Sequence, residues 1–162
     1  MQLSKMTKEI ELLKEVDEAF PCMEMPESAE LLFHQDQCRS CAEVRRYLDA
    51  SRGVKADDAL IRFIHQQLYH LSPVAFRWIL PSYLKFCLSS VSSQEEVYFL
   101  VYNLSPDQEF QEDTYRRLSA LNAAQIRCLI HFLNWCSGNE CWVEIRGDVD
   151  KAIKFLHTVK AE

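Results

Sequence analysis

Glycine and proline are scarce in this chain: its 162 residues include three glycines and five prolines. Tight hairpin turns usually need glycine or asparagine at positive φ, so a sandwich or barrel of many strands would require more turn residues than are present. Helices joined by short segments of Ser, Asp and Pro need few of them. The scarcity therefore favours an all-α fold.

Long apolar runs are also missing. No stretch approaches the roughly 18 uninterrupted apolar residues that a membrane span needs. The first turns of the chain, MQLSKMTKEIELLKEV, carry charge throughout and have no apolar core of a secretory signal. We expect a protein without membrane attachment, located in the cytoplasm.

Positive charge is in deficit, with 18 Lys and Arg against 24 Asp and Glu and a net charge of −6. Binding to phosphates depends on clustered Lys and Arg that release counterions. Nucleic acid is therefore not expected as a partner. An acidic chain can instead attract a basic protein.

What the chain does contain is enough apolar surface for one core: 48% of its residues are hydrophobic and 11% are aromatic. Helical periodicity predicts an N-terminal helix in residues 1–20, a crossover loop in 21–35, a helical core in 36–136 and a C-terminal helix in 148–160. We expect a single compact multi-helix domain covering residues 1–162.

The central element of that domain is predicted after Ser72-Pro73, because Ser is a good N-cap and Pro is favoured at the first helical position. The following residues are nearly all apolar, which is typical of a buried helix. Pro81 lies inside it and predicts a kink. Local caps predict four further helix starts, at Asp36 or Ser40, Asp57 or Asp58, Ser93, and Asn122.

Seven cysteines make an odd number, and reduced thiols are expected. His34, Cys38 and Cys41 have the residue types and close spacing of a zinc site, although they supply only three ligands. Two buried thiols at a helix start are the alternative favoured by the sequence, and a redox pair would need a surrounding βαβ pattern that is absent. His65, His70 and His131 lie in apolar helical surroundings and are interpreted as structural.

Two further features carry charge. Arg77 stands in the apolar central helix and is expected to form a buried ion pair or to bind an anion. Asp107, Glu109, Glu112 and Asp113 form an acidic segment, which is either a solvated loop or a patch that binds a basic partner.

The stretch Leu71-Ser72-Pro73 followed by Phe76-Arg77-Trp-Ile-Leu80-Pro81-Ser-Tyr83-Leu84 resembles a bacterial domain family of unknown function with an SPxAFRxxLPxYL-like pattern. The resemblance extends from the Phe20-Pro21 junction to the helix start at Asn122. It implies a bacterial origin and supplies no catalytic residues.

Function is not determined by these observations. The small acidic chain without catalytic motifs favours a non-enzymatic protein-binding module, such as a bacterial immunity-type protein, with no cofactor. The alternative is a small metal- or thiol-dependent enzyme that uses His34, Cys38 and Cys41, with zinc as its cofactor. A homodimer is compatible with either hypothesis.

Overall fold

The computed structural model describes residues 2–34, 38–89 and 94–161, and within these ranges it contains eight α-helices and no strand. The all-α prediction is confirmed. The helices are α1 (Gln2–Ala19), α2 (Arg39–Ala50), α3 (Asp58–Ile64), α4 (Pro73–Leu88), α5 (Gln94–Leu104), α6 (Gln111–Leu118), α7 (Ala123–Ser137) and α8 (Arg146–Leu156). Short 3-10 helices join them: η1 (Ser28–Glu30), η2 (His65–His70), η3 (Gln108–Phe110) and η4 (Glu140–Ile145).

Three helix starts follow the caps expected from the sequence. The Ser72 hydroxyl accepts the amide hydrogen bond of Ala75, with Pro73 in the first turn of α4. The Asp57 carboxylate accepts the amide of Leu60 at the start of α3. Asn122 forms a full reciprocal capping box at the start of α7. These amides would otherwise lack partners, so the caps fix where the helices begin.

The central helix α4 is buried as predicted. Nine of its 16 residues lie in the core, and the chain runs as one helix through Pro81. It packs against α1 and α6. The buried Tyr83 donates its hydroxyl hydrogen bond to the carbonyl of Glu96, 2.6 Å away, and so joins α4 to α5. The buried side chains of all these helices form one core.

Two predicted boundaries are wrong. Cys38 rather than Ser40 caps α2, because its Sγ accepts the amide of Cys41 at 3.2 Å. The C-terminal helix spans Arg146–Leu156 rather than 148–160, and just beyond it Thr158 donates to the Phe155 carbonyl at 2.6 Å. The helix from Asp58 continues as the 3-10 helix η2, which ends at His70, and Leu71 is extended and pairs with Leu32. The proposed caps Asp36 and Ser93 lie outside the described residues.

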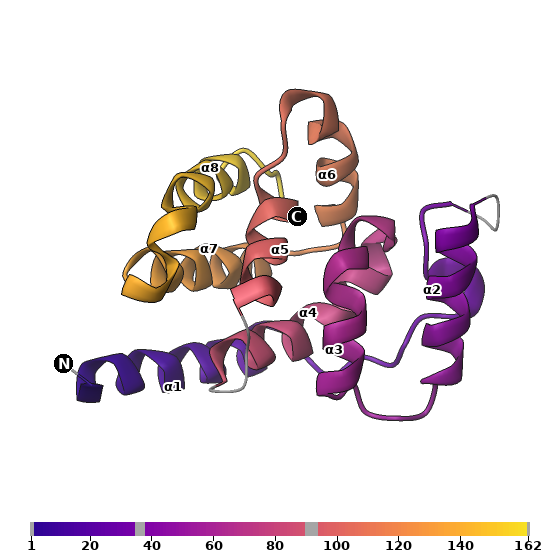
Figure 1. Ribbon diagram of the computed structural model, residues 1–162, viewed down its shortest axis with the longest axis horizontal. Coiled ribbons are helices and arrows are strands. Elements are labelled where there is room, and N and C mark those ends of the chain that lie inside the picture. The colour runs from indigo at the N-terminus through magenta and orange to yellow at the C-terminus, as the bar shows by residue number, and fades with distance from the viewer. Residues whose placement is uncertain (1, 35–37, 90–93, 162) are drawn as a thin grey trace.

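Figure 1 shows how the helices are arranged. Helix α1 extends along one end of the molecule and α2 stands at the opposite end, while α5 and α6 occupy the middle. The C-terminal half of α1 is packed against α4 and α7, whereas its first turns expose Leu3, Met6 and Ile10. Across the parts of the chain that the structure describes, no helix has both the length and the apolar character of a membrane span.

Candidate functional site

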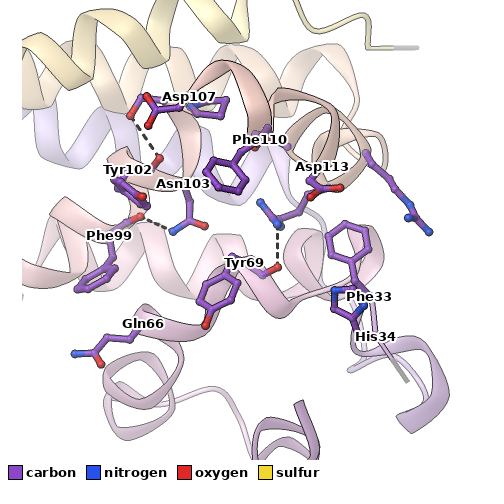
Figure 2. Close-up of a pocket in the computed structure, with 15 residues that line it drawn as sticks. Phe33, His34, Gln66, Tyr69, Phe99, Tyr102, Asn103, Asp107, Phe110 and Asp113 are labelled. Atoms are coloured by element: carbon purple, nitrogen blue, oxygen red, sulfur yellow. Dashed lines mark hydrogen bonds between the residues drawn. The ribbon is translucent and has the colours of Figure 1, made fainter. Parts of the chain in front are cut away.

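A cavity of about 540 Å³ opens between η2, α5 and the segment that contains η3 and α6. Pockets for small-molecule ligands typically measure roughly 300–1,000 Å³. Figure 2 shows the side chains of Tyr69, Tyr102 and Phe110 around this space. The cavity is therefore of a size that can hold a ligand.

Five aromatic residues line the cavity: Phe33, Tyr69, Phe99, Tyr102 and Phe110. Phe99 and Tyr102 are three residues apart on α5, so they project from neighbouring positions of one helical face. Tyr69, Tyr102 and Phe110 are 54%, 57% and 51% exposed. Large aromatic side chains that remain this exposed provide contact surface at the mouth of the cavity as well as inside it.

Arg117 is the buried charge of this site, with only 6% of its surface exposed. Its Nη2 donates to the carbonyl oxygen of Tyr69 at 2.8 Å, and its guanidinium lies 5.3 Å from the centre of the Phe33 ring. Burial lowers the pKa of Arg117 to about 10, an effect that Asp113 partly opposes. The side chain therefore stays charged at neutral pH inside an aromatic environment.

The guanidinium of Arg117 is not neutralised by the described residues. Within the ranges 2–34, 38–89 and 94–161, no carboxylate lies at ion-pair distance from it, and its buried Nε has no hydrogen-bond partner. A guanidinium presents five N–H donors in a fixed plane that matches a carboxylate. The wall of the cavity thus contains a buried cation with one N–H donor that has no partner among the described residues.

Further polar groups surround the aromatic wall. The exposed Arg116 also lies over the Phe33 ring, 5.1 Å from its centre. Asn103 lines the cavity, and its Nδ2 donates to the Phe99 carbonyl at 2.8 Å, which fixes the orientation of the amide. Such fixed polar groups in an apolar pocket provide orientation for a ligand.

The predicted acidic segment lies beside this cavity. Asp107 and Asp113 line the cavity, and Glu109 and Glu112 are exposed on the neighbouring helical turns. Asp107 pairs with Lys151 at 2.7 Å, which joins the segment to α8. The four carboxylates therefore form an exposed rim, and their binding to a partner stays a prediction.

Arg77 is half-buried in α4. Its buried Nε has no hydrogen-bond partner, and no carboxylate among the described residues lies at ion-pair distance from it. The more buried arginine is Arg117, which the sequence interpretation missed. No local pattern marked it, because its burial depends on contacts with Tyr69 and Phe33, which are distant in the sequence.

The predicted metal ligands separate into two groups. Cys38 and Cys41 lie close together at the start of α2, and their histidine neighbour is His70 of η2 rather than His34. His34 is exposed and lines the aromatic cavity. No local spacing indicated His70, because it follows Cys41 by 29 residues.

The fold and the cavity define the class of this protein as an α-helical domain with an aromatic, arginine-containing cavity between its helices. The chain belongs to a family of unknown function (DUF6714), whose model matches residues 35–157. The match confirms that the chain resembles a domain family of unknown function. It begins at residue 35 rather than at the Phe20-Pro21 junction, and it includes the C-terminal helix α8, beyond the limit that the sequence resemblance gave. No curated protein and no solved structure shows significant similarity to the chain.

Proposed function

We propose that this domain is a protein-binding module that holds an apolar, carboxylate-bearing segment of a partner in the cavity between η2, α5 and α6. The observation that carries the proposal is the buried Arg117, whose Nε lacks a hydrogen-bond partner in a wall of aromatic side chains. Binding a carboxylate there would supply the acceptor that the guanidinium lacks. Charged hydrogen bonds of this kind are about twice as strong as neutral ones.

The exposure of the aromatic side chains at the opening of the cavity favours a protein partner over a small-molecule ligand. Pockets for small molecules bury most of the surface of their ligand. Here Tyr69, Tyr102 and Phe110 stand more than half exposed around the opening. On the outer face of α5, Tyr98 stacks with Tyr102 at 6.5 Å between ring centres and continues the aromatic surface. Tyrosine and arginine are enriched among the residues that dominate protein interfaces.

The acidic rim agrees with a partner of mixed charge. Exposed carboxylates near the opening would attract basic residues that flank the bound segment, in a way that salt weakens. A bacterial immunity-type protein would fit this description. The seven cysteines are free thiols, which suits a reducing compartment such as the cytoplasm.

The test is selection from a library of displayed random peptides against the full chain. We expect enriched peptides that combine an aromatic residue with an acidic side chain or a terminal carboxylate. Their affinity should fall at least tenfold in Arg117→Met, because the charged acceptor loses its partner.

Arg127→Met provides the matched control, since Arg127 is exposed on α7 and does not line the cavity. The proposal is wrong if no peptide is enriched, or if the peptides bind Arg117→Met and wild type equally.

A further inference from the structure

We propose that Cys38, Cys41 and His70 form a zinc site that joins the N-terminus of α2 to η2. One ligand atom of each side chain lies within 4.8 Å of the others. The residues come from two segments, the start of α2 and the end of η2, which meet where Cys41 Sγ lies 3.4 Å from His70 Nδ1. The site is separate from the aromatic cavity and does not depend on the proposed function.

The distances are close to those that a tetrahedral zinc ion requires. With Zn–S near 2.3 Å and Zn–N near 2.0 Å, two thiolates lie about 3.8 Å apart, and a thiolate and an imidazole nitrogen lie about 3.6 Å apart. In the structure, Cys41 Sγ and His70 Nδ1 are 3.4 Å apart. Only small side-chain movements are needed to complete the geometry.

The three groups have the chemistry of zinc ligands, because zinc binds thiolates and neutral imidazole. Cys38 lies at the N-terminus of α2, where the Cys41 amide donates to its Sγ at 3.2 Å. Cys41 and His70 are buried and Cys38 is half-buried. A water molecule would take the fourth position of the tetrahedron.

A metal ion bound here would link the start of α2 to η2. Helix α2 stands at one end of the molecule (Figure 1), and its other end is fastened to the crossover segment by Arg52, whose Nη2 donates to the Pro26 carbonyl at 2.9 Å. Zinc would fasten the N-terminal end to η2. Because η2 also carries Tyr69, the same ion would support one wall of the aromatic cavity.

The test is zinc titration of the full chain after metal removal, under reducing conditions, followed by native mass spectrometry and thermal unfolding. We expect one zinc ion per chain and a rise of the melting temperature of roughly 5 °C or more at saturation. Substitution with Co²⁺ should produce thiolate-to-metal charge-transfer absorption, which reports the sulfur ligands directly.

The critical variant is Cys38→Ser, because serine retains a good N-cap for α2 while removing one thiolate. Zinc affinity should fall more than about 100-fold, since even changes outside the direct ligands cost 10–100-fold. His70→Gln should weaken binding as well. The double variant Cys22→Ser/Cys141→Ser is the control, because both thiols are exposed and lie outside the cluster.

Two results would overturn the proposal. One is the absence of zinc binding by wild type at micromolar metal. The other is equal zinc affinity of wild type and Cys38→Ser. If the reduced chain binds no zinc, formation of a Cys38–Cys41 disulfide in a glutathione buffer would assign the pair to redox chemistry.

Discussion

Replacing Arg117 by methionine tests whether this residue serves ligand binding or the stability of the fold. Burial lowers the pKa of Arg117 to about 10. Relative to an exposed arginine, this corresponds to about 3 kcal/mol against the charged form. The hydrogen bond to the Tyr69 carbonyl contributes about 2 kcal/mol in return, and the contact with Phe33 contributes about 1 kcal/mol. The net contribution of the charged Arg117 side chain to the free energy of folding is therefore close to zero.

Methionine has a similar length and no charge, and apolar replacements of buried ions are often neutral or stabilising. We expect the free energy of unfolding of Arg117→Met to lie within about 1 kcal/mol of wild type in urea denaturation followed by circular dichroism. The affinity for the selected peptides should fall at least tenfold at the same time. Unchanged stability together with weakened binding is the result expected of an arginine that binds a ligand and does not stabilise the fold.

The opposite pattern would refute this reasoning. A loss of about 3 kcal/mol or more would mean that Arg117 holds the fold together, as a member of a buried ionic network does. Arg127→Met controls for the general effect of removing one positive charge. It should change neither the unfolding free energy nor the binding by a measurable amount, because exposed charges contribute little.

Three further predictions concern the fold. Asn122→Ala should lower the unfolding free energy by about 1 kcal/mol, because the capping box of α7 is lost; an unchanged urea midpoint would contradict this. Tyr83→Phe should cost about 1–2 kcal/mol by leaving the Glu96 carbonyl without this donor, also measured in urea. With metal removed, a thiol reagent at pH 8 should modify the exposed Cys22 and Cys141 and the half-buried Cys38 quickly. It should modify the four buried thiols only on unfolding, since burial raises the pKa of three of them, Cys87, Cys128 and Cys136; rapid modification of more than three thiols would be the contrary result.

The sequence by itself determined the helical class and several helix starts. Ser72, Asp57 and Asn122 act on amides only three residues away, so their effect is visible in a short window of sequence. The burial of α4 was equally predictable, because nearly all of its residues are apolar. The start of α2 was missed, since a cysteine at the N-cap is not among the preferred residues.

Only the tertiary structure decided how the chemical groups meet. Arg117 reaches the carbonyl of Tyr69, 48 positions earlier, and His70 meets Cys41 from 29 positions later. Local propensities carry no information about such separations, because these contacts form only when η2 packs against α5 and pairs with the crossover segment. The sequence predicted Cys38 and Cys41 as candidate metal ligands. The packing of the helices brings His70 next to them and buries Arg117.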